Sequence, residues 1–113
     1  MRLHHSTTLA VLAVAVAVAV PVAGSAAAPA GKTVVLKNIA FHPKKVTVMK
    51  GATVTWSWQD GATPHNVTAT GKTKFKSSPT KQSGKYSVKF AKAGTYHYEC
   101  TIHPGMTGVV VVK

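Results

Sequence analysis

Apolar and polar residues alternate with a period of two through most of the chain after residue 30. The alternation is clearest in Lys45–Lys50, Thr53–Trp58, Lys85–Phe90 and Thr95–Cys100. In a β-strand this pattern places the apolar side chains on one face of a sheet. No stretch after residue 30 keeps the 3.6-residue period of an amphipathic helix. Since turn residues such as Gly51 and Gly94 separate the alternating segments, we expect an all-β sandwich of about seven to eight strands.

Further strands are expected outside these four segments. Thr33–Ile39 is apolar enough for a first strand, and Gly108–Lys113 predicts a last strand that is covered on both sides. Lys74–Ser77 is a weaker candidate inside a loop rich in lysine, serine and threonine. The alternation predicts that Trp56 lies in the core, whereas Trp58 fits either the core or the rim of a site.

The first thirty residues have a different character. A start that carries Arg2 is followed by the apolar run Leu9–Ala23 and by the small residues Gly24–Ala28. This is the layout of a secretory signal peptide. We therefore expect residues 1–28 to be a signal peptide, with cleavage between residues 25 and 30.

Cleavage would leave residues 29–113 as one exported domain, in the periplasm or in the extracellular or cell-surface space. The alternative is that the apolar run is retained as a membrane anchor. That run is about 15 residues long, which is shorter than the roughly 18–20 residues of a spanning helix.

The chain contains one cysteine, so no internal disulfide is possible. Small exported domains usually compensate for a modest core with disulfides or a metal, and a metal is therefore expected. The only acidic residues are Asp60 and Glu99. This scarcity argues against catalysis by paired carboxylates and against a Ca²⁺ or Mg²⁺ cage of oxygen ligands.

Metal-ligating side chains gather near the C-terminus. Cys100, His103 and Met106 form a Cys-x2-His-x2-Met motif between two expected strands, and His65 lies upstream in the loop after Trp58. A thiolate, two imidazoles and a thioether are a soft ligand set that suits copper, and two histidines, a cysteine and a distant methionine are the ligands of blue-copper sites. The alternation in Thr95–Cys100 places Cys100 inward and His97 on the opposite, outer face.

Several segments carry a resemblance to a known family. They are Ile39–Pro43, Val46–Val48, Val54–Trp56, Asp60–Val67 and Ala93–His103. Together they resemble the cupredoxins of the plastocyanin/azurin family, which are type 1 blue copper proteins. The short spacing from Cys100 to Met106 is similar to that of amicyanin-like members.

This resemblance implies a cupredoxin-like Greek-key β-sandwich that binds one copper ion and cycles it between Cu(I) and Cu(II). It implies His65, Cys100 and His103 as equatorial ligands and Met106 as the axial ligand. It also implies that Asn66 ties the His65 loop to the ligand loop by hydrogen bonds, which would orient the ligands.

The function expected from these residues is that of a soluble, monomeric one-electron carrier. Electrons would pass through the exposed edge of His103, and the apolar docking surface around it would consist of Pro64, Ile102, Pro104 and Gly105. The alternative is a protein for copper capture or delivery, which would use the same ligands. An enzyme is not expected, because copper oxidases and reductases need further histidine motifs that this chain lacks.

The net charge indicates which kind of molecule the protein would bind as a partner. The formal charge is +12, carried almost wholly by lysine, and it favours an acidic redox protein or an anionic membrane surface. Nucleic acid is not expected, because the signal peptide and the absence of arginine after Arg2 argue against it.

Overall fold

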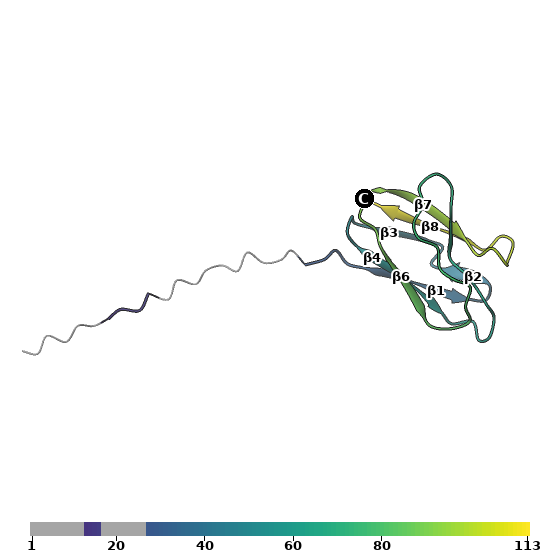
Figure 1. Ribbon diagram of the computed structural model, residues 1–113, viewed down its shortest axis with the longest axis horizontal. Helices are drawn as coiled ribbons and strands as arrows, with labels where there is room; N and C mark the ends of the chain where they lie inside the picture. The colour runs from purple at the N-terminus through teal and green to yellow at the C-terminus, as the bar shows by residue number, and fades with distance from the viewer. Residues whose placement is uncertain (1–12, 17–26) are drawn as a thin grey trace, which may run out of the picture.

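The computed structural model describes residues 13–16 and 27–113, and within these ranges it contains eight strands and no helix (Figure 1). The strands are β1 (Lys32–Lys37), β2 (Ala40–His42), β3 (Lys45–Val48), β4 (Thr53–Trp58), β5 (Thr68–Thr70), β6 (Lys85–Lys89), β7 (Gly94–Glu99) and β8 (Thr107–Val112). They form two four-stranded sheets, in the orders β2-β1-β4-β6 and β3-β8-β7-β5. The predicted all-β sandwich is confirmed.

The predicted signal peptide falls largely outside the described residues and stays a prediction. In the part of the chain that the structure describes, no helix is long and apolar enough to cross a membrane.

The core lies between the two sheets and is built by the predicted alternation. Val54, Trp56 and Trp58 of β4 are buried, as are Tyr96 and Tyr98 of β7. The Trp56 side chain is fully buried, as predicted. Its ring stacks on that of Phe75 at a centroid distance of 5.5 Å and meets the edge of Tyr98 at 5.4 Å. Burying side chains of this kind contributes roughly 1.5–3 kcal/mol each, so this aromatic cluster is a main source of stability.

The structure corrects the predicted bounds of the first strand. β1 ends at Lys37 rather than Ile39, because Asn38 and Ile39 have positive φ angles of 52° and 53° and turn the chain into β2. The short strands β2 and β5 were not predicted, since three residues are too few to show an alternation.

The weaker strand prediction at Lys74–Ser77 is wrong. These residues are not in a strand, and side-chain hydroxyls replace the backbone pairing there. The Ser77 hydroxyl accepts a hydrogen bond from the N–H of Ala69 at 3.0 Å, and the Ser78 hydroxyl accepts one from the N–H of Val67 at 2.8 Å. Together with one backbone bond, from the N–H of Ser78 to the carbonyl of Val67 at 2.8 Å, these serine hydroxyls hold the segment that contains β5 in place of a further strand.

Strand pairing decides which loops meet at one end of the sandwich. β7 pairs antiparallel with both β5 and β8, and Thr68 lies opposite Glu99. Cys100 directly follows β7, and His65 lies shortly before β5. The β5–β7 pairing therefore brings His65 beside Cys100, although 35 positions separate them in the sequence.

Candidate metal centre

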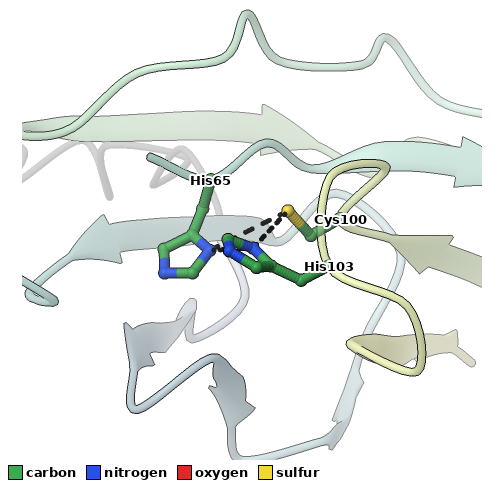
Figure 2. Close-up of side chains that lie close together, drawn as sticks. All are labelled: His65, Cys100 and His103. Atoms are coloured by element: carbon green, nitrogen blue, oxygen red, sulfur yellow. Dashed lines mark hydrogen bonds between the residues drawn. The ribbon is translucent and has the colours of Figure 1, made fainter. Parts of the chain in front are cut away.

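Three potential ligands converge at this end of the sandwich. Nδ1 of His65 lies 3.1 Å from Nδ1 of His103, and Sγ of Cys100 lies 3.8 Å from the first nitrogen and 3.4 Å from the second (Figure 2). All three donor atoms lie within 4.8 Å of one another, and no other such group of His, Cys, Asp or Glu is found in residues 13–16 and 27–113. The structure thus brings together three of the four predicted ligands, one of them distant in sequence.

The backbone of His65 is held from several sides. Its carbonyl oxygen accepts hydrogen bonds from the indole Nε1 of Trp58 at 2.9 Å and from the N–H of Lys81 at 3.1 Å. Its own N–H donates to the carbonyl of Lys81 at 3.0 Å. The Lys81 ammonium lies over the Trp58 ring, 4.5 Å from its centroid. Trp58 therefore belongs to both the core and the wall of the site, which settles the alternative left open by the sequence.

The ligand loop is closed by its own backbone. The N–H of Cys100 donates to the carbonyl of Met106 at 2.9 Å, and the N–H of Met106 donates to the carbonyl of His103 at 3.1 Å. Gly105 has a φ of 82°, a conformation that a glycine adopts without steric cost. The short Cys-to-Met spacing thus gives a compact turn that directs Cys100 and His103 to the same point.

Met106 is buried at 3 % exposure, at the base of this turn and directly before β8. Its backbone contacts with Cys100 and His103 keep it in the immediate neighbourhood of the donors. Its thioether as the fourth ligand remains a prediction.

The side chain of Asn66 joins three segments near the ligands. Its Nδ2 donates to the hydroxyls of Thr101 at 2.8 Å and Thr80 at 3.0 Å. Its Oδ1 accepts from the N–H of Thr101 at 3.0 Å and from the hydroxyl of Thr68 at 2.7 Å. These are the bonds between the two ligand-bearing loops that the resemblance implied, and their effect on the ligands is a prediction.

We expect Asn66→Ala to lower the free energy of unfolding of the metal-free protein by about 2 kcal/mol, because it leaves buried donors and acceptors without partners. Urea denaturation followed by tryptophan fluorescence measures the loss. Thr80→Val is the matched control, since it removes one partly exposed bond of the same network and should cost under about 1.5 kcal/mol. Equal losses in the two variants would show that Asn66 does not join the loops.

The surroundings of Cys100 suit a thiolate bound to a soft metal. The thiol is 3 % exposed, and its sulfur accepts a hydrogen bond from the N–H of Asn66 at 3.5 Å. Two imidazoles, one sulfur and no carboxylate oxygen converge on the same point, a donor set that copper prefers over Mg²⁺ or Ca²⁺. The residues present therefore fit copper.

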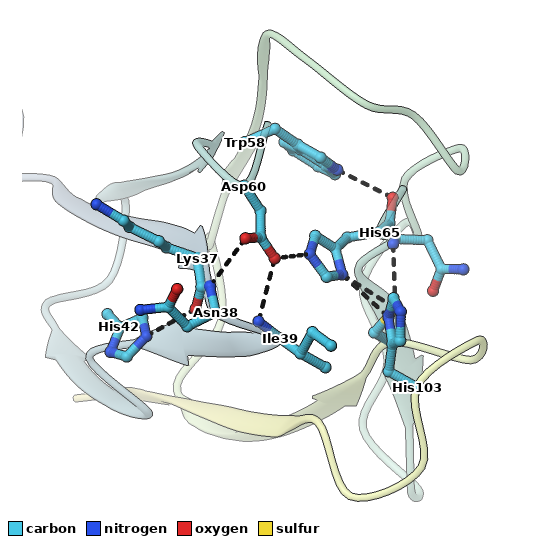
Figure 3. A network of polar contacts seen from close by, with 10 residues as sticks. Lys37, Asn38, Ile39, His42, Trp58, Asp60, His65 and His103 are labelled. Atoms are coloured by element: carbon cyan, nitrogen blue, oxygen red, sulfur yellow. Dashed lines mark hydrogen bonds and ion pairs between the residues drawn. The ribbon is translucent and has the colours of Figure 1, made fainter. Parts of the chain in front are cut away.

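The predicted docking residues lie around this centre with unequal exposure. Ile102 is 44 % exposed, Pro104 and Gly105 are exposed, and Pro64 is half-buried. The structure adds Ile39, which is 52 % exposed in the β1–β2 turn and lies on the site's side of the molecule (Figure 3). Sequence alternation could not place Ile39 there, because its position depends on the turn.

The structure also reveals a residue that the sequence analysis did not assign to the site. Oδ2 of Asp60 accepts a hydrogen bond from Nε2 of His65 at 2.7 Å. This bond from His65 holds the pKa of Asp60 below its ordinary value, and the N–H of Ile39 acts in the same direction. The signal in the sequence was the presence of a carboxylate five residues before a ligand in a chain with only two acidic residues.

Comparison with known proteins agrees with this geometry. The family model of copper binding proteins of the plastocyanin/azurin family matches residues 30–113. The chain belongs to this family. The predicted copper cofactor is confirmed at the level of the family, and three of the predicted ligands, His65, Cys100 and His103, lie together as a copper site requires.

Amicyanins are among its most similar relatives. Amicyanin-alpha of Methylorubrum extorquens is 43 % identical over 91 residues, which cover 76 % of each chain. Amicyanin of Paracoccus denitrificans is 38 % identical over 82 residues, which cover 69 % of this chain and 62 % of that protein. A solved structure of a reduced Cu(I) form of an amicyanin variant superposes with a TM-score of 0.67 at 33 % identity, covering 74 % of this chain and 82 % of the other.

Proposed function

We propose that this protein is an exported, soluble one-electron carrier with a mononuclear type 1 copper centre. The observation that carries the proposal is the convergence of His65 with Cys100 and His103, two residues of a turn closed by its own backbone. When bound, copper would supply a centre that alternates between Cu(I) and Cu(II). Met106 would complete the ligand set.

A carrier of this kind benefits from ligands that move little between the two oxidation states. The hydrogen bonds to the backbone of His65 and across the ligand loop hold the donors from outside. The backbone N–H of Asn66 donates to the Cys100 sulfur at 3.5 Å and helps to fix the position of that sulfur. The site is thereby organised by the fold rather than by the metal alone.

The difference between the two histidines suggests the route of the electron. His65 is fully buried, whereas His103 is half-exposed in the ligand loop. His103 is therefore the ligand that a partner can approach. Exposed Ile102, Pro104 and Gly105, with half-buried Pro64, would form a small apolar docking surface around it, and weak redox encounters need only a small interface.

The charge of the protein would steer it to an acidic partner. Removal of the predicted signal peptide, which contains Arg2, changes the formal charge from +12 to +11. A strongly positive surface raises the association rate with an acidic protein in a salt-dependent manner. The partner class is therefore an acidic redox protein, and an anionic membrane surface would attract the same lysines.

We expect the second-order rate of electron transfer to an acidic redox protein to fall at least about tenfold between low and high ionic strength. Stopped-flow absorbance at several salt concentrations measures this rate. A neutral small-molecule reductant is the control, because its rate should depend little on salt. A rate with the acidic protein that does not change with salt would contradict steering by the lysines.

A further inference from the structure

Asp60 makes three hydrogen bonds next to the metal centre. It lies in the loop after β4, and its side chain is 15 % exposed. Oδ2 accepts from Nε2 of His65 at 2.7 Å and from the N–H of Ile39 at 3.1 Å, and Oδ1 accepts from the N–H of Asn38 at 3.0 Å (Figure 3). One carboxylate therefore contacts both a ligand and the β1–β2 turn.

The bond to His65 selects one form of its imidazole. A neutral imidazole carries a proton on one nitrogen and a lone pair on the other. Because the Asp60 carboxylate can only accept a hydrogen bond, Nε2 of His65 must be the donor and carries the proton. The lone pair then lies on Nδ1. Nδ1 is the atom that faces Cys100 and His103 (Figure 2), so the tautomer held by Asp60 is the one that can bind a metal.

The bonds to the turn fix the position of the carboxylate. Asn38 and Ile39 have φ angles of 52° and 53°, and the left-handed conformation is unusual for a β-branched residue such as Ile39. Strained residues of this kind persist only when the surrounding structure holds them. The two backbone N–H groups and the Asp60 carboxylate hold one another, which favours the orientation of the carboxylate toward His65.

We propose that Asp60 is a positioning residue of the copper centre, which orients His65 through Nε2 and favours the oxidised over the reduced state. A carboxylate on the outer nitrogen of a ligating histidine raises the basicity of the ligand. Its negative charge also stabilises the more positive metal ion. The inference rests on the proposed copper centre.

The test compares Asp60→Asn with Glu99→Gln. Each variant removes one negative charge from a side chain of nearly unchanged shape, but Glu99 lies on β7 and makes no hydrogen bond to a ligand side chain among the described residues. We expect Asp60→Asn to weaken Cu(II) binding about 10–100-fold in competition with a chelator and to raise the reduction potential. Glu99→Gln should have a smaller effect on both the Cu(II) affinity and the reduction potential. Equal effects of the two variants would show that only the net charge of the protein matters.

A second background separates positioning of His65 from stability of the turn. Ile39→Gly removes the conformational strain at position 39, because glycine adopts a positive φ freely. In this background the turn depends less on Asp60, so adding Asp60→Asn should cost less stability. In the Ile39→Gly background, Asp60→Asn should still weaken copper binding by the same factor as it does in the wild type. If Asp60→Asn no longer weakens copper binding there, Asp60 acts only on the turn.

The metal-free protein gives a readout that does not depend on copper. In ¹⁵N-labelled protein, the two ring nitrogens of His65 should show the shifts of an Nε2–H tautomer, and Asp60→Asn should reduce that preference. An Asp60→Asn variant that leaves the His65 tautomer, the copper affinity and the reduction potential all unchanged would contradict the proposed role of Asp60, even when the wild-type copper centre forms as proposed. If the wild type binds no copper but the tautomer changes, the orientation of His65 by Asp60 stands and the proposed function fails.

Discussion

The Cys100→Ser variant is expected to bind Cu(II) without the intense visible absorption of the wild type. That absorption requires a thiolate bound to copper, and a serine hydroxyl is a harder, neutral donor that does not supply it. Sγ of Cys100 is also the only sulfur shown in the three-donor cluster of the described residues. Absorption spectra after addition of one equivalent of Cu(II) measure the loss, which should be complete.

The loss must be separated from misfolding. Serine is close to cysteine in size, so the metal-free variant should keep the far-ultraviolet circular dichroism of the wild type. His97→Ala is the matched control on the strand that leads to Cys100, because His97 is exposed on the outer face of β7 and its removal should leave the colour unchanged. A blue Cys100→Ser protein would show that the ligand assignment is wrong.

Trp56→Ala is expected to lower the free energy of unfolding by about 3–5 kcal/mol. The side chain is fully buried, and its ring lies within 6.4 Å, between centroids, of those of Phe75, Tyr86, Phe90 and Tyr98. The truncation removes apolar contacts and leaves a cavity among these rings. Because small domains unfold with only about 5–15 kcal/mol in total, this loss is a large fraction of the stability of the protein.

Urea denaturation of the metal-free protein, followed by circular dichroism, measures this effect without the contribution of bound copper. Met49→Ala is the control, since Met49 is 59 % exposed and its truncation should cost within about 0.5 kcal/mol. A loss below about 1 kcal/mol for Trp56→Ala would contradict an aromatic core centred on this residue.

The inward and outward faces of the long strands were predictable from the sequence. The pattern in Thr53–Trp58 has a period of two, and the bounds of β4 agree with the prediction. Ser57, which the alternation places on the outer face, is nevertheless buried at 5 % exposure. The alternation in β6 predicts that Tyr86 and Val88 face the core, but both side chains are only half-buried. β6 is the last strand of its sheet, and position in a sheet is not encoded in a local alternation.

The convergence of the ligands was predictable for a different reason. The spacing of Cys100, His103 and Met106 indicated a metal loop, the position of His65 after the Trp58 strand made it the further candidate ligand, and the family resemblance added Asn66. The hydrogen bond from Nε2 of His65 to Asp60 was not predictable, because it depends on the conformation of the loop after β4 and on two backbone donors from the β1–β2 turn. Contacts that depend on the meeting of two irregular segments leave no periodic pattern in the sequence.

We propose that His65, Cys100, His103 and Met106 bind copper as a type 1 redox centre. The most direct test adds Cu(II) to the purified protein and records visible absorption and electron paramagnetic resonance. We predict an intense blue band and a narrow copper hyperfine splitting, both lost reversibly on reduction. A colourless protein whose copper passes readily to a metal-free acceptor would contradict electron transfer and favour copper capture or delivery.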